Sequence, residues 1–310
     1  MNSLSSSKST TSTDSTIVST PTSGSPSTST STTIRTMHSM ENVQKNHKSV
    51  LIAGFPGPGL VGSISTSYMI DKLNMRQIAC VESKYISPGV IYVDGKLRHP
   101  FRLYATDDGN VCVLVCEAPI MLNGIHSVLD TVMDWAIKNT IREVLVLEGI
   151  PVQGIPRPDR QPVILGSMEM DDNIRNMHKA SEKNPSDSFG SSDEVSIQTN
   201  FNKSLIDESR KYNTFIGGIA GGLLSTCLSH QIPCAAILVP SPSGIPDPEG
   251  AALLIESYNN IINDEKLKIN TAQLKEQGQI LKTQLEQIIK AAQEQRGDSS
   301  TMMGQRVMYG

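Results

Sequence analysis

The sequence predicts an α/β protein: a three-layer α/β/α sandwich around a mixed sheet, followed by a long C-terminal helix. Short continuous apolar runs, typical of buried strands, alternate with segments of helical periodicity. Two Asp-Gly dipeptides separate other apolar runs, which indicates hairpins and therefore antiparallel strands. After residue 264 the chain turns polar, with leucines at seven-residue spacing. Alternating strands and helices together with hairpins favour one layered domain.

The alternating elements are expected in a definite order. Buried strands are predicted at 49–55, 77–82, 143–149, 162–167 and 233–240, and helices at 60–73, 122–139, 215–231 and 251–263. The last of these helices has a clear start, because Asp247 precedes Pro248 and Glu249 in the first turn.

The antiparallel part is expected between the second strand and the second helix. The runs 90–93 and 101–106 flank Asp94-Gly95, and the runs 101–106 and 111–117 flank Asp108-Gly109. Asp-Gly supplies the positive φ angles that tight hairpin turns need.

Composition divides the chain into four parts. Residues 1–47 are rich in Ser and Thr and are predicted to be a disordered tail, because they have too little apolar surface to offset ordering. Residues 48–264 form the predicted domain, with a flexible polar insertion at about 179–200. Residues 265–296 are the expected helix or coiled coil, and 297–310 a flexible tail.

Charge and cysteine usage narrow the functional classes. The formal net charge is −4, and the predicted domain has no basic cluster, which argues against a nucleic-acid partner. No apolar run has membrane-spanning length. The five cysteines lie in apolar stretches, which suits buried thiols in a reducing compartment. With no apolar signal segment near Met1, these features predict a cytoplasmic protein without a membrane partner.

Residues 54–62 contain a G-x-G-x-x-G pattern, formed by Gly57, Gly59 and Gly62. It follows a predicted strand and opens a helix, and Glu82 ends the next strand. This is the context of a dinucleotide fingerprint, in which the acidic residue binds a ribose hydroxyl. Pro58 removes an amide donor from the loop, however, and hairpins follow Glu82 where crossover helices are expected. A nucleotide-binding enzyme is therefore the alternative, and a tight strand-to-helix turn the preferred interpretation.

Other catalytic or metal arrangements are not evident. None of the six histidines has a ligand-spaced Cys, His or carboxylate partner, and no serine elbow or G-K-[ST] phosphate loop occurs. Asp159 and Arg160 lie in a polar loop and are expected to be solvated. The sequence therefore predicts no catalytic residue, no metal and no cofactor, hence a protein that is not an enzyme.

The leucine repeat after residue 264 has two explanations. The seam consists of Leu267, Leu274, Leu281, Leu285 and Ile288. So narrow a stripe suits a coiled coil, and we expect it to drive self-association into a homo-oligomer. The same stripe also suits a helix that packs back on its own domain, and Gly278 interrupts the seam. A third hypothesis is a scaffold whose coiled coil binds an unrelated helix.

Four segments in order resemble the PAC2 family of proteasome assembly chaperones and their archaeal homologues. They are GFPGPGLVGSIS at 54–65, EAPI at 117–120, GIAGGLLS at 218–225 and CAAILVPSPSGIPDPEGA at 234–251, within a resemblance that covers about 48–265. The resemblance implies a phosphorylase-like sandwich without an established cofactor. It also implies oligomers that contact the α subunits of the core proteasome without using ATP.

The last three residues, Met308-Tyr309-Gly310, resemble the hydrophobic-Tyr-X docking tail of proteasome activators and of some archaeal PAC2 members. A tyrosine ring and an apolar neighbour fill a cleft, while lysine or backbone donors capture a terminal carboxylate. The resemblance therefore predicts binding to core proteasome α subunits or the α ring through this tail.

Overall fold

The computed structural model describes residues 32–37, 49–93, 95–154, 156–168, 214–262, 264–285 and 287. The strands are β1 Thr32–Thr36, β2 Ser49–Gly54, β3 Arg76–Ser83, β4 Ile91–Val93, β5 Lys96–Arg98, β6 Phe101–Ala105, β7 Val111–Cys116, β8 Ile141–Val152, β9 Val163–Gly166 and β10 Cys234–Pro242. The helices are α1 Val61–Lys72, α2 Ile125–Lys138, α5 Gly218–Ser229 and α6 Pro248–Ile261, with 3-10 turns η2 Pro58–Leu60, η3 Leu122–Gly124 and η5 Glu265–Leu267. Residues 272–285, called here the C-terminal helix, are also helical.

The main sheet is mixed, as predicted. Its eight strands have the order β1-β3-β6-β7-β2-β8-β10-β9. The central strands β7, β2, β8 and β10 are parallel, and the strands on both flanks are antiparallel. Continuous apolar sequences form the central strands because both of their faces are covered: every residue of β2 and β7 is buried.

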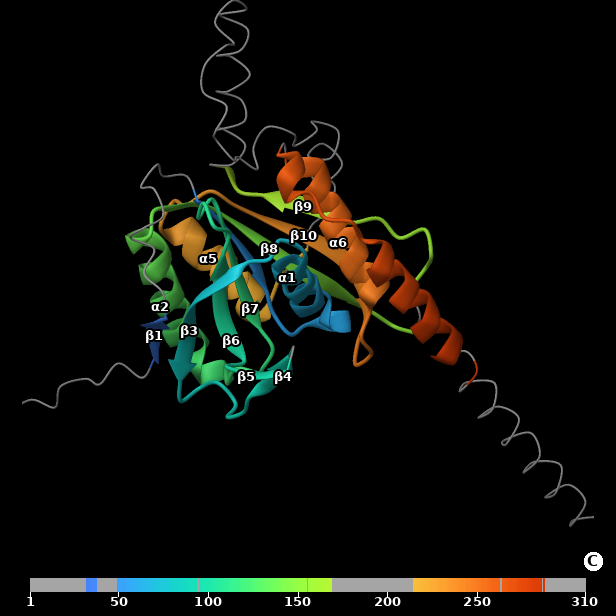
Figure 1. Ribbon diagram of the computed structural model, residues 1–310, viewed down its shortest axis with the longest axis horizontal. Helices are drawn as coiled ribbons and strands as arrows, with labels where there is room; N and C mark the ends of the chain where they lie inside the picture. The colour runs from blue at the N-terminus through green and yellow to red at the C-terminus, as the bar shows by residue number, and fades with distance from the viewer. Residues whose placement is uncertain are drawn as a thin grey trace, which may run out of the picture. The chain divides into compact units, whose positions relative to one another are not determined.

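Helices cover both faces of this sheet, so the predicted α/β/α sandwich is confirmed. Alternate side chains of β2 enter different cores: Val50 and Ile52 one, Leu51 and Ala53 the other. The first core contains residues of α1 and α6, and the second contains residues of α2 and α5. Figure 1 shows α1 and α6 on one side of the sheet and α2 and α5 on the other.

The hairpin predictions are confirmed in part. Gly109 has φ +70° in the turn between β6 and β7, which pair in antiparallel fashion. Gly95 also has a positive φ, but the strand that pairs with β4 is β5, not the 101–106 run. That run is β6, which lies in the main sheet between β3 and β7.

The N-terminal segment contributes a strand that the composition does not predict. The expectation of disorder over 1–47 is wrong for Thr32–Thr36, which form β1 and pair with β3. The Thr32 hydroxyl lies 2.9 Å from the hydroxyls of both Ser83 and Ser127, and Arg35 pairs with Glu82. This short edge strand, rich in β-branched residues, is ordered by its pairing with β3, and local composition does not predict that pairing. The other expected flexible segments, 179–200 and 297–310, lie outside the described residues.

The C-terminal helix packs on the α1 and α6 side of the domain. Leu267, Ile269 and Leu274 are part of the first core. The Tyr68 hydroxyl donates to the Asn270 carbonyl at 2.9 Å, and Lys275 pairs with Glu256 of α6 at 2.6 Å. No helix within the described ranges is long and apolar enough to cross a membrane.

Candidate functional site

The glycine-rich loop lies beyond the carboxyl end of β2, where ligands bind in many open α/β sheets. In this structure the loop packs closely against the ends of the neighbouring strands β8 and β10. A Cβ added to Gly57 would lie 2.0 Å from Glu148 Oε1, and one added to Gly59 would lie 2.9 Å from the Ser241 Cβ. Gly59 also has φ +65°. The glycines are therefore required for close packing and for the turn.

This packing removes the basis of the dinucleotide alternative. A Cβ on Gly62 would lie 2.5 Å from the Leu147 carbonyl oxygen, so this glycine also faces protein. Glu82 lies on β3, which β6 and β7 separate from β2, and it binds Arg35 instead. The structure does not bring Gly57, Gly59, Gly62 and Glu82 together around a ligand space. This geometry favours the interpretation of the G-x-G-x-x-G pattern as a tight strand-to-helix turn.

A buried ion pair between Arg160 and Asp247 lies at the same end of the sheet. Arg160 Nη1 lies 2.5 Å from Asp247 Oδ2, and Arg160 Nη2 lies 2.8 Å from Asp247 Oδ1. Arg160 also donates to the Pro240 carbonyl, and Asp247 caps α6 by accepting from the Gly250 amide at 2.9 Å. The expectation that Arg160 is solvated is wrong, because it is 8% exposed. This bidentate pair ties the loop after β8 to the start of α6.

Glu148 is a further buried ionisable group at this end of the sheet. It ends the apolar part of β8, and its Oε1 accepts a hydrogen bond from the Gly149 amide at 2.8 Å. Burial raises the pKa of this carboxyl to about 7, although the amide hydrogen bond opposes the shift. A lone acidic residue in a continuous apolar run is the sequence signal for such a group.

The C-terminal helix crosses the start of α6 next to this site. A Cβ on Gly278 would lie 3.1 Å from backbone and Cβ atoms of Glu249. The absence of a side chain at Gly278 therefore allows the C-terminal helix to approach α6 closely. Leu281 and Leu285 are half-buried there and line a small pocket of about 60 Å³ together with Arg160. Figure 1 shows the helix continuing outward past α6.

The structure divides the predicted leucine seam. Leu267 and Leu274 are 7% and 2% exposed and lie in the chain's own core, so their assignment to self-association is wrong. The alternative, a helix packed on its own domain, holds for these two residues. Leu281 and Leu285 stay predicted contacts, and Ile288 lies outside the described residues, as do Met308, Tyr309 and Gly310.

A second pocket, of about 430 Å³, lies between α1 and the C-terminal helix. Its lining includes Leu60, Tyr68, Leu274 and Gln277, with the carboxylates of Asp71 and Glu117 and no basic side chain from the described part of the chain. An acidic lining repels phosphate, so this pocket does not suit a nucleotide. The geometry of this end of the domain is that of a packed scaffold carrying a projecting helix.

A family model describes the greater part of the chain: the model of the PAC2 family matches residues 51–289. The chain belongs to the PAC2 family. This match confirms the resemblance carried by the four sequence segments.

Two relatives are similar to this chain over most of its length. A curated, uncharacterized protein of Methanocaldococcus jannaschii is 24% identical over 240 residues, covering 77% of this PAC2 chain and 84% of the relative. A solved protein of unknown function from Thermoplasma acidophilum is 29% identical, with a TM-score of 0.57, over 82% of this chain and 91% of the other.

Two solved structures from Pyrococcus furiosus are similar in fold. PbaA, an archaeal homolog of proteasome-assembly chaperone, has a TM-score of 0.62 at 17% identity, over 90% of this chain and all of its own. PbaB, an archaeal proteasome activator, has a TM-score of 0.60 at 18% identity, over 84% and 99%.

Proposed function

We propose that this PAC2 protein is an ATP-independent proteasome assembly chaperone or adaptor that binds core proteasome α subunits. The C-terminal residues Met308, Tyr309 and Gly310 make the contact, and a homo-oligomer displays several such tails. Support comes from family membership and from the fold shared with an archaeal chaperone homolog and an archaeal proteasome activator. The role is not enzymatic and needs no cofactor.

The observation that carries the proposal is the anchored C-terminal helix. Leu274 and Gly278 fix the helix on the domain, while its later residues become half-buried or exposed. A helix held at its start and directed away from the domain presents whatever follows it at a distance from the sheet. Residues 297–307 then serve as a leash that reaches about 20 Å if they behave as a flexible chain.

Several tails on one oligomer strengthen the contact. Linked weak contacts gain avidity by roughly 10²–10⁴-fold where the spacing allows simultaneous binding. Leu281 and Leu285 are the residues of the leucine seam that lie within the described part and outside the domain core. We assign the self-association contact to this half of the helix, in place of the whole seam.

Deletion of Met308–Gly310 tests the docking tail. We expect association of the full chain with purified proteasome α rings, measured by surface-immobilised binding, to fall at least tenfold. Tyr309→Ala reproduces the loss because it removes the ring, and Met303→Ala in the preceding segment is the matched control. Undiminished association of the deleted chain removes the tail from the mechanism.

A further inference from the structure

The geometry points to a divalent transition-metal site formed by Cys80, Glu82 and His99 at the β1–β3–β6 edge of the sheet. Sulfur, carboxylate oxygen and imidazole nitrogen are the three ligand types that zinc takes in proteins. The three residues are far from the glycine-rich loop in the sheet order, and the site is independent of the proposed proteasome contact.

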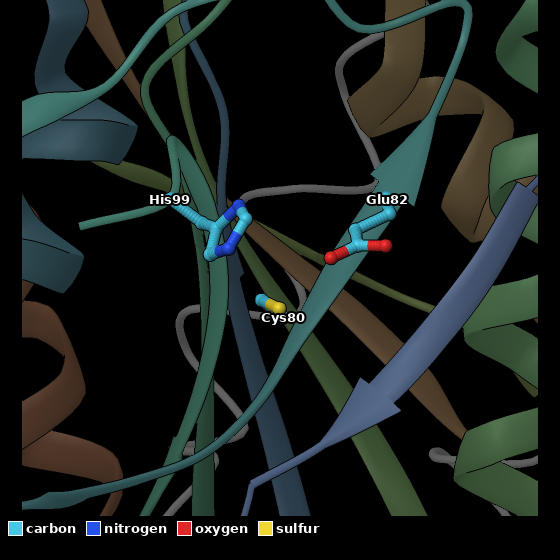
Figure 2. Close-up of side chains that lie close together, drawn as sticks. All are labelled: Cys80, Glu82 and His99. Atoms are coloured by element: carbon cyan, nitrogen blue, oxygen red, sulfur yellow. The ribbon is translucent and has the colours of Figure 1, made fainter.

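The fold brings these residues together although the sequence separates them. Cys80 and Glu82 are two positions apart on β3, so both side chains lie on one face. His99 lies between β5 and β6, and Cys80 is directly opposite Arg102 of β6. One ligand atom from each residue lies within 4.8 Å of the other two. Figure 2 shows the three side chains bordering one space.

The spacing is close to what a tetrahedral ion requires. Metal–ligand bonds of about 2.0–2.3 Å place tetrahedral ligand atoms roughly 3.3–3.7 Å apart. The present separations, which reach 4.8 Å at most, need to contract by up to about 1.5 Å. Cys80 is buried on its strand, whereas Glu82 is half-buried and His99 is exposed. The imidazole has room to move toward the other two ligands, and Glu82 can follow by giving up one of its two contacts with Arg35. The exposed side at His99 leaves room for water as a fourth ligand.

The charges around the site also suit a cation. A thiolate and a carboxylate balance the charge of a divalent ion. Arg35 faces Glu82, with Nε 2.9 Å from Oε1 and Nη2 3.0 Å from Oε2. One carboxylate oxygen can stay on Arg35 while the other binds metal, which is a common supporting arrangement.

Arg102, which lies opposite Cys80 on β6, already has an anionic partner. Arg102 donates to the Glu117 carboxylate at 2.5 Å and to the carbonyl oxygen of His99. The second of these bonds holds the backbone of His99 beside β6, which positions the imidazole. Among the described residues, this is the single group of three or more His, Cys, Asp or Glu side chains with metal-site spacing.

Cobalt binding to the full chain tests the site. The protein is stripped with a chelator and titrated with Co²⁺, which reports on its ligands by absorption. We expect one equivalent to produce a thiolate-to-cobalt charge-transfer band and the visible bands of a four-coordinate ion, both removed by added Zn²⁺. Absence of the charge-transfer band overturns the proposal.

Variants assign the ligands. Cys80→Ser removes the charge-transfer band, while His99→Ala and Glu82→Gln each weaken Co²⁺ binding at least tenfold. His126→Ala removes an exposed histidine on α2 and leaves binding unchanged. If Cys80→Ser does not fold, His99→Ala and Glu82→Gln still show whether these residues bind the metal. Binding that survives both His99→Ala and Glu82→Gln places the metal elsewhere and refutes the assignment.

Discussion

The raised pKa of Glu148 makes the stability of the domain depend on pH in a direction unusual for a carboxyl group. The folded protein holds this proton up to about pH 7, whereas the carboxyl has a pKa of 4.5 without the burial. Between these values the native state binds more protons than the unfolded state, so stability falls as pH rises. The contribution is fully present below pH 4.5 and is lost as pH rises through about 7.

The size of this loss follows from the shift. One pKa unit corresponds to about 1.4 kcal/mol, so the shift at Glu148 amounts to about 3 kcal/mol between pH 4 and pH 8. Glu148→Gln does not titrate, and its amide oxygen can still accept from the Gly149 amide. Relative to the natural protein, we expect this variant to gain about 3 kcal/mol over the same pH interval.

Urea unfolding at several pH values measures this difference. The free energies of Glu148→Gln and of the unaltered chain are subtracted at each pH, so that groups titrating equally in both proteins cancel. Glu276→Gln, at an exposed position of the C-terminal helix, controls for loss of a negative charge. Two parallel stability curves for Glu148→Gln and the unaltered chain would refute the reasoning.

Two further predictions concern the α6 end of the domain. Arg160→Ala leaves the buried Asp247 carboxylate without its partner, and it should lower the free energy of unfolding by about 3–5 kcal/mol in urea titrations. Arg157→Ala, at an exposed position, is the control, and an equal effect of both variants contradicts the burial argument. Leu274→Asp should lower the melting temperature because this side chain lies in the core. Leu281→Asp should instead reduce the oligomer mass in light scattering, with little change in the melting temperature. The reverse pattern contradicts the proposed division of the leucine seam.

Local sequence patterns were sufficient for the layered fold. Apolar runs and helical periodicity locate the central strands and the helices, because burial on two faces or on one stripe leaves a direct trace in the sequence. The sequence predicts Asp247 as a helix start, and Asp247 caps α6 as expected. Strand β1 left no such trace, because its order depends on pairing with β3 more than forty residues later.

Contacts between distant segments account for the other differences. Arg160 belongs to a polar loop by composition, and only its ion pair with Asp247 explains its burial. Cys80 and His99 are too far apart in the sequence to match a metal-ligand spacing. Only the antiparallel pairing of β3 with β6 brings them together. A leucine every seventh residue fits self-association and intramolecular packing equally well. The close approach of Gly278 to Glu249 decides between them for the first half of the helix.

The pairing of β1 with β3 has a consequence for shortened forms of the protein. Cutting the chain at the start of β2, where composition places the domain boundary, removes the five-residue strand that covers the eight-residue β3. The amide and carbonyl groups along that side of β3 then lack partners, and an open β-edge recruits strands from other molecules. Such a truncated protein would be prone to aggregate even though each remaining helix and strand is intact.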